Sequence, residues 1–135
     1  MPTNSGLPPS ITLSSRDLAQ LEAMLESPAV AKLPAAIALG EELNRAHVVD
    51  AGQLPAGIVT MRSRVQCHDE VSNDTHTLTL VYPHEADVDR GYVSVLAPVG
   101  SALLGLSVGQ SIDWVAPGGR PLRLRVAAVE QPAAP

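Results

Sequence analysis

Residues 93–119 read VSVLAPVGSALLGLSVGQSIDWVAPGG, and the pattern of these letters predicts a strand, a short helix, a second strand and a turn. Val93 and Val95 alternate with a polar residue, which is typical of a strand with one buried face. Pro98 ends this strand because it has no amide hydrogen for the ladder. Its fixed φ suits the first turn of a helix, so we expect the helix to begin there.

The predicted helix has an apolar face at three- and four-residue spacing, formed by Ala102, Leu103 and Leu106. Gly109 is expected to close the helix, because glycine adopts positive φ without a steric penalty. Residues 111–115 return to the strand pattern. Pro-Gly-Gly at 117–119 predicts a turn before the next strand.

The rest of the chain predicts one α+β domain around this stretch. Alternating or β-branched apolar residues predict strands at 58–67, 75–81, 92–96, 111–115 and 122–129. Residues that favour turns separate these segments. One short helix crossing an antiparallel sheet with one buried face belongs to the α+β class, and we place this domain at 58–130.

Before this domain, the sequence predicts a short antiparallel helical hairpin at 11–49. Its first helix is expected at 15–27, capped by Ser14 or Ser15, and its second helix begins at Pro34 and runs to about residue 48. An arm of about 13 residues is about 20 Å long. The remaining divisions are a disordered N-terminus at 1–10, a connector at 50–57 and a frayed tail at 131–135.

Composition limits the partners of the protein. The 135 residues carry a net charge of −5, which repels a phosphate backbone, and few aromatic side chains for stacking on bases. We therefore expect no direct binding to nucleic acid. No apolar run is long enough to span a membrane. Cys67 is the single cysteine, which excludes an internal disulfide and suits a reducing cytoplasm.

No pattern in the sequence predicts an enzyme active site, a metal site or a cofactor. The four histidines do not lie at ligand spacing from one another, so we expect no bound metal. Cys67 and His68 are neighbours in a predicted strand and should point to opposite faces, which argues against a nucleophile and base pair. Neither glycine-rich phosphate-binding motif occurs, so no nucleotide cofactor is expected.

Several ordered motifs resemble a known family. Residues 94–119, with ALLG at 102–105, VG at 108–109 and PGG at 117–119, closely resemble the C-terminal domain of the bacterial Gre transcript-cleavage factors. Four further motifs resemble the Rnk family, short relatives of the Gre factors known as regulators of nucleoside diphosphate kinase. They are LESPA at 25–29, VTMRSRV at 59–65, LVYP at 80–83 and APVG at 97–100. The resemblance runs from residue 11 to about residue 130.

The resemblance implies a fold and a partner. It implies that the domain at 58–130 is FKBP-like, which names the fold and not an isomerase activity. It also implies that this domain docks on bacterial RNA polymerase at the rim of the secondary channel, through the loop before the short helix. The matching positions are Leu96, Ala97, Pro98 and Val99. The alternative is that Leu96 and Val99 pack inside the domain; an exposed Leu96 would favour docking.

The same resemblance implies a helical finger whose acidic tip helps to hold a catalytic Mg²⁺ inside the polymerase. Mg²⁺ prefers oxygen ligands, yet the predicted tip at 28–33 contains no Asp or Glu and carries Lys32. We therefore interpret the acids of the two predicted helices mainly as a solvated face. These acids are Glu22, Glu26, Glu41 and Glu42.

The sequence thus favours a cytoplasmic, non-enzymatic regulator that binds RNA polymerase at the Gre docking site without stimulating transcript cleavage. An alternative hypothesis is direct regulation of nucleoside diphosphate kinase or another metabolic enzyme. A third hypothesis, prolyl isomerase activity, is suggested by the fold alone. It is disfavoured because the chain has too few aromatic residues to build a proline pocket.

Overall fold

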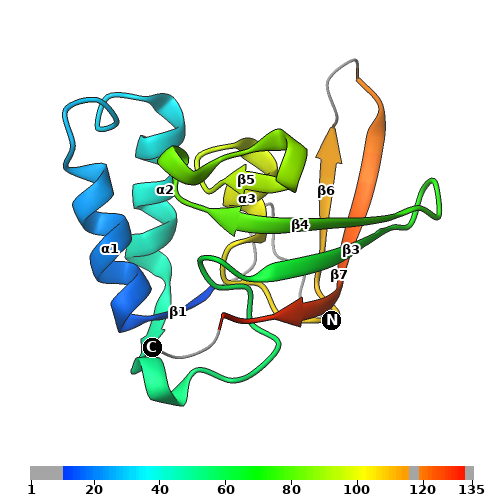
Figure 1. Ribbon diagram of the computed structural model, residues 1–135, viewed down its shortest axis with the longest axis horizontal. Coiled ribbons are helices and arrows are strands. Elements are labelled where there is room, and N and C mark those ends of the chain that lie inside the picture. Colours follow the sequence, from blue (N-terminus) through cyan, green and yellow to red (C-terminus); the bar gives the residue numbers. More distant parts are fainter. Residues whose placement is uncertain (1–10, 116–118, 133–135) are drawn as a thin grey trace.

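The computed structural model describes residues 11–115 and 119–132 of the chain (Figure 1). Three predictions therefore fall partly or wholly outside the described residues. They are the N-terminal segment at 1–10, residues 117–118 of the expected turn, and positions 133–135 of the expected tail. Within the described residues, no helix is both long enough and apolar enough to cross a bilayer.

A five-stranded sheet forms the centre of the molecule, in the order β5-β4-β3-β7-β6. Its strands are β3 (Arg64–Asp69), β4 (Thr75–Val81), β5 (Tyr92–Ser94), β6 (Ser111–Val115) and β7 (Pro121–Glu130). The sheet and its few helices confirm the α+β class. The expectation of a purely antiparallel sheet is wrong, because β4 and β5 pair in parallel.

The parallel pairing follows from the connection between β4 and β5. The chain between these strands forms two short 3-10 turns, η2 (Pro83–Glu85) and η3 (Val88–Arg90). Gly91 then adopts a left-handed φ of 72°, and Tyr92 pairs back to Asp87. The chain therefore reverses twice before β5, so β5 enters the sheet in the same direction as β4.

Strand β3 begins later than the predicted strand at 58–67, because a tight turn precedes it. Thr60 and Ser63 are buried in this turn. The Thr60 N–H donates to Ser63 Oγ at 2.9 Å, and the two side-chain hydroxyls are also hydrogen-bonded to each other. Arg62 lies between them with a φ of 66°, a left-handed conformation that is uncommon for a residue with a side chain. The turn carries Arg62 to the surface.

Helices α1 (Ser15–Leu25) and α2 (Pro34–Arg45) lie side by side at one edge of the molecule (Figure 1). Ser14 caps α1, since its Oγ accepts the Asp17 N–H at 3.0 Å. Pro34 opens α2, as predicted. Helix α2 stops at Arg45 rather than near residue 48.

The early end of α2 has a clear cause. Ala46 is extended, and the His47 N–H donates to the Ile11 carbonyl at 2.8 Å. Residues His47–Val49 then form strand β2, which pairs in parallel with strand β1 (Thr12–Ser14). Two consecutive valines favour this extended backbone. The small two-stranded sheet ties the start of α1 to the end of α2.

Helix α3 (Pro98–Leu103) begins at the expected proline but ends before Gly109. Gly105, with a φ of 81°, breaks the helix instead. The Gly105 N–H donates to the Val59 carbonyl at 2.9 Å, and its own carbonyl accepts the Thr12 N–H at 3.2 Å. Both backbone polar groups of Gly105 are therefore hydrogen-bonded to neighbouring segments and do not extend the helix.

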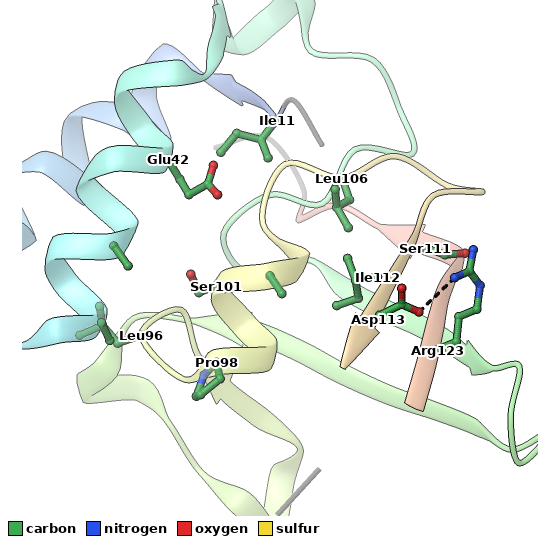
Figure 2. Close-up of a pocket in the computed structure, with 13 residues that line it drawn as sticks. Ile11, Glu42, Leu96, Pro98, Ser101, Leu106, Ser111, Ile112, Asp113 and Arg123 are labelled. Atoms are coloured by element: carbon green, nitrogen blue, oxygen red, sulfur yellow. Dashed lines mark hydrogen bonds and ion pairs between the residues drawn. The ribbon is translucent and has the colours of Figure 1, made fainter. Parts of the chain in front are cut away.

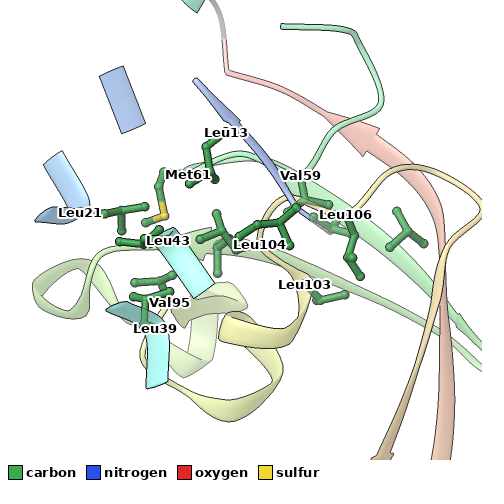
Figure 3. Packing of buried hydrophobic residues seen from close by; sticks show 14 of the residues in the cluster. Leu13, Leu21, Leu39, Leu43, Val59, Met61, Val95, Leu103, Leu104 and Leu106 are labelled. Carbon is green, nitrogen blue, oxygen red and sulfur yellow. The ribbon is translucent and has the colours of Figure 1, made fainter. Parts of the chain in front are cut away.

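One hydrophobic cluster joins the helices to the sheet. Leu21, Leu39 and Leu43 from α1 and α2 are buried in the same cluster as Val95 and Leu104 (Figure 3). The Gln131 side chain also donates to the Pro55 and Ile58 carbonyls, at 3.0 Å each, which fixes the end of β7 to the segment after β2. The helix pair therefore shares its core with the sheet.

Candidate functional site

A groove of about 760 Å³ lies between α2, α3 and β6, and we call it the α2–α3 groove (Figure 2). Small or apolar side chains form most of its walls: Ala35 and Ala38 of α2, Ala102 of α3, and Ile11, Leu106 and Ile112. Leu96, Pro98 and Ser101 complete the wall beside α3. The groove is therefore a largely apolar depression bounded by rigid elements.

The structure brings together two of the four predicted partner-binding residues in this groove. Leu96 is half-buried and Pro98 is exposed, and both line the groove. Ala97 and Val99 are half-buried and do not line it; Val99 packs on the hydrophobic core. Leu96 also touches that core, so its side chain combines a packing role with a surface in the groove.

Backbone hydrogen bonds hold the loop that carries Leu96 and Pro98. The Val95 N–H donates to the Val81 carbonyl at 2.8 Å, which extends the parallel pairing beyond β5. Ser94 then caps the turn twice, since its carbonyl accepts the Ala97 N–H at 2.9 Å and its Oγ accepts the Leu96 N–H at 3.0 Å. The loop is therefore preorganised, which lowers the entropic cost of binding a partner.

The two carboxylates that line the α2–α3 groove each have a cationic partner. Glu42 forms an ion pair with Arg45, and Asp113 accepts a hydrogen bond from Arg123 Nη1 at 3.0 Å (Figure 2). Because these charges are compensated, the groove presents an apolar surface rather than a centre of one sign. This surface suits a protein partner better than a phosphate or a metal ion.

A polar contact fixes α1 on the sheet domain. The Asp17 carboxylate accepts the Met61 N–H at 3.1 Å, and the Tyr82 hydroxyl donates to Gln20 Oε1 at 2.8 Å. Burial raises the pKa of Tyr82 to about 12, so its hydroxyl keeps its proton. Both hydrogen bonds join α1 to segments more than 40 residues later in the chain, so they set the orientation of α1.

Arg62 completes this contact from the left-handed turn. Its guanidinium donates to both carboxylate oxygens of Glu85, at 3.0–3.2 Å, and lies 5.2 Å from the centre of the Tyr82 ring. The hydrogen bond from Arg62 lowers the pKa of Glu85. Glu85 in turn accepts the Tyr82 N–H at 3.3 Å. Contacts of the Arg62 side chain with Glu85 and Tyr82 therefore help to offset its unusual backbone conformation.

Asp17 provides a stability test of the α1 contact. Burial raises the pKa of the Asp17 carboxyl despite the hydrogen bond from the Met61 N–H, so the folded state disfavours the charged form. The free energy of unfolding therefore falls as the pH rises through the pKa of Asp17 in the folded protein. We expect Asp17→Asn, which keeps an acceptor without the charge, to raise Tm at pH 7. Asp17→Ala should lower the free energy of unfolding by about 1 kcal/mol, because it leaves the Met61 N–H unpaired. Thermal denaturation of both variants checks this order; a less stable Asp17→Asn would contradict it.

Cys67 and His68, the neighbours considered as a nucleophile and base, both lie in β3. Cys67 is buried in β3, and burial raises the pKa of its thiol to about 11, so the reactive thiolate is scarce. His68, the next residue, is half-exposed, as expected for alternate faces of a strand. Among residues 11–115 and 119–132, no three His, Cys, Asp or Glu side chains cluster as metal ligands.

The connection between α1 and α2 is short, and the acids of the two helices lie outside it. The helices have 11 and 12 residues, which makes them only about 17–18 Å long. Lys32 is exposed in this connection, and Glu26 follows the last residue of α1. Glu41 and Glu42 lie in the second half of α2. No carboxylate occurs between residues 27 and 33.

The α2 side of the groove was missed by reasoning from the sequence. Ala35 and Ala38 lie three residues apart and so share one face of α2. Their spacing in the sequence was the available signal, because two small residues on one helix face leave room for a neighbour. That neighbour is α3 across the groove, which no local pattern could identify.

Family models match most of the chain. The model described as "Rnk N-terminus" matches residues 9–49, and the model described as "Transcription elongation factor, GreA/GreB, C-term" matches residues 54–131. The curated protein named "Regulator of nucleoside diphosphate kinase" from Escherichia coli (strain K12) is 42% identical over 90% of both chains. These matches confirm the predicted resemblance.

Two further relatives extend the comparison. "Transcription elongation factor GreA" of Rhodospirillum rubrum is 41% identical over 60% of this chain and 52% of its own length. The solved structure titled "Prokaryotic transcription elongation factor GreA/GreB from Nitrosomonas europaea" has a TM-score of 0.78 and 45% identity, covering 91% of this chain and 99% of the other. These relatives carry the names of regulators or transcription factors rather than of enzymes.

Proposed function

The chain belongs to the Rnk family, whose C-terminal domain is of the GreA/GreB type, and on this premise we propose that it is a regulator that binds bacterial RNA polymerase at the secondary channel. The observation that carries this proposal is the α2–α3 groove. It exposes Pro98 and part of Leu96 at the loop where the Gre resemblance implies docking.

We extend the proposal to the two parts of the molecule. Residues 58–130 act as an FKBP-like docking domain, and residues 11–49 act as a short hairpin held against it by the α1 contact. The preorganised loop and the apolar groove support this division, because a partner that fills the groove would touch α2 and α3 together. Docking would then present the helix pair at a fixed angle.

The protein is proposed to dock without stimulating transcript cleavage. Stimulation through Mg²⁺ requires carboxylates that reach the polymerase centre, since Mg²⁺ takes oxygen ligands. The helices are about 17–18 Å long, and their connection has no Asp or Glu between residues 27 and 33. A protein of this kind would occupy the site of a cleavage factor and so compete with it.

Competition on core RNA polymerase tests the proposal. We expect this protein to displace a labelled GreA factor. Pro98→Asp should weaken this binding about tenfold, because it places an unpaired charge in the apolar groove while aspartate remains favourable at a helix start. Val88→Asp is the matched control, since Val88 is 94% exposed on η3 and does not line the groove.

Two outcomes would overturn parts of the proposal. A failure to displace GreA would reject docking at a shared site. Robust Mg²⁺-dependent cleavage in stalled elongation complexes would reject the claim about cleavage. Binding to nucleoside diphosphate kinase but not to polymerase would favour the alternative suggested by the name of the Escherichia coli relative.

A further inference from the structure

A second groove of about 460 Å³ runs between α1 and α2, and we call it the helix-pair groove. Its apolar part is formed by Leu25 of α1 and by Ile37 and Leu43 of α2. Ile37 is 56% exposed, which is unusual for a side chain of its size on an amphipathic helix. Leu33, one turn before Ile37, is 44% exposed and extends the apolar surface toward the connection.

Gly40 keeps the helix-pair groove open. It lies in the interior of α2, where glycine destabilises a helix by about 1 kcal/mol relative to alanine. A Cβ atom at this position would lie 3.8 Å from Leu25 Cδ1, an ordinary contact, so packing of the two helices does not require glycine there. The absent side chain leaves a hollow beside Leu25 and Ile37.

Three carboxylates border this hollow: Glu22 and Glu26 of the α1 side and Glu41 of α2. None of them forms an ion pair with any residue in the described part of the chain. Arg45, the cation at the end of α2, pairs instead with Glu42. The helix-pair groove therefore combines an apolar floor with an uncompensated negative rim, unlike the α2–α3 groove.

We propose that the helix-pair groove binds a basic amphipathic helix of a partner protein. An apolar stripe of such a helix would cover Leu25 and Ile37, and Lys or Arg side chains beside the stripe would meet the three carboxylates. Helix α1 is about 17 Å long, which accommodates about three turns of a partner helix. This surface is distinct from the α2–α3 groove that the proposed polymerase docking uses.

The two grooves are separate surfaces. They share no lining residue, because Ala35, Ala38 and Glu42 face the α2–α3 groove, whereas Ile37 and Glu41 face the helix-pair groove. These sets lie on different faces of one helix. The protein would then link the partner in the α2–α3 groove to a second protein that carries the basic helix.

Binding of a synthetic peptide to the full chain tests this proposal. The probe is a labelled helical peptide of about four turns, with leucines at i, i+3, i+4 and i+7 and lysines on both sides of them. Fluorescence anisotropy should show saturable binding, weakened about tenfold by Ile37→Ser and also by the combined change of Glu22, Glu26 and Glu41 to Gln. All four side chains are at the surface, so circular dichroism should show intact helices.

The controls separate this site from general attraction to an acidic protein. A scrambled peptide of the same composition should bind at least tenfold more weakly, and Asp89→Asn, which removes an exposed charge on η3, should have no effect. Pro98→Asp should leave peptide binding unchanged even if polymerase docking fails. Equal binding of the scrambled peptide, or insensitivity to Ile37→Ser, would overturn the proposal.

Discussion

Replacing Gly100 with alanine should lower the free energy of unfolding by about 3 kcal/mol, and Tm by roughly 10 °C. The cause is the close approach of α3 to the end of β5. A Cβ atom on Gly100 would lie far inside van der Waals distance of the Ser94 carbonyl oxygen and 3.0 Å from Leu80 Cδ1. The carbonyl is backbone and already accepts the Ala97 N–H, so it cannot move away without loosening the loop.

Thermal denaturation and polymerase competition measure both consequences of Gly100→Ala. Because the same loop carries Leu96 and Pro98, we expect GreA displacement to weaken together with stability. Gly52→Ala is the matched control: a Cβ there would meet no atom within 4 Å, so stability should stay the same or rise slightly. A Gly100→Ala protein as stable as Gly52→Ala would show that α3 tolerates displacement from β5.

Local pattern predicted two strands of the sheet with their observed bounds. The predicted strands at 75–81 and 111–115 have the observed bounds of β4 and β6. Alternation along β3 is also visible in the structure, where Val65 and Cys67 are buried and Gln66 is exposed. The bounds of these strands and the alternation of buried and exposed residues depend on the residues of the strand itself, so they can be predicted from the sequence.

Two of the predictions that failed, the ends of α3 and α2, depend on distant segments. Gly105 and Gly109 both have positive φ, but α3 ends before Gly105, whose N–H donates to the Val59 carbonyl and whose carbonyl accepts the Thr12 N–H. The end of α2 is likewise fixed by pairing of β2 with β1. No window of a few residues around Gly109 or Val48 contains these partners, so periodicity and propensity could not identify them.

The candidate site was predictable in part. Resemblance identified the loop with Leu96 and Pro98, whereas the opposite wall of the groove comes from α2 and depends on how the helix pair packs. Asp69 was missed in a different way, because it lies among the turn-favouring residues between the strands predicted at 58–67 and 75–81. Ser72 at the third position after it was an available signal for a side chain that caps its own turn.

Asp69 is fully buried at the end of β3 and organises the turn to β4. Its carboxylate accepts hydrogen bonds from Ser72 Oγ at 2.7 Å, from the Val71 N–H at 2.9 Å and from the Arg123 N–H of β7 at 3.3 Å. The Asp69 N–H donates to the Asp74 carbonyl at 2.8 Å. One side chain thus satisfies donors from the turn and from the neighbouring strand. We expect Asp69→Ala to lower Tm by roughly 10 °C, because it removes the buried acceptor of these three hydrogen bonds.

The charge of Asp69 should also govern acid stability. The hydrogen bond from Ser72, followed by those from backbone amides, lowers the pKa of Asp69 from 3.8 to about 2. Protons therefore bind the unfolded chain more readily, so the stabilisation by the Asp69 carboxylate is complete above pH 3.8 and is lost as pH falls through about 2.

Urea denaturation of the wild type and Asp69→Asn between pH 6 and pH 2 measures this loss of stability. Ser72→Ala should raise the Asp69 pKa and shift the loss to higher pH. Comparison with Asp69→Asn is needed because Glu85, whose pKa Arg62 lowers, adds acid sensitivity of the same sign. Parallel stability curves for the wild type and Asp69→Asn would mean that this carboxylate does not contribute through its charge.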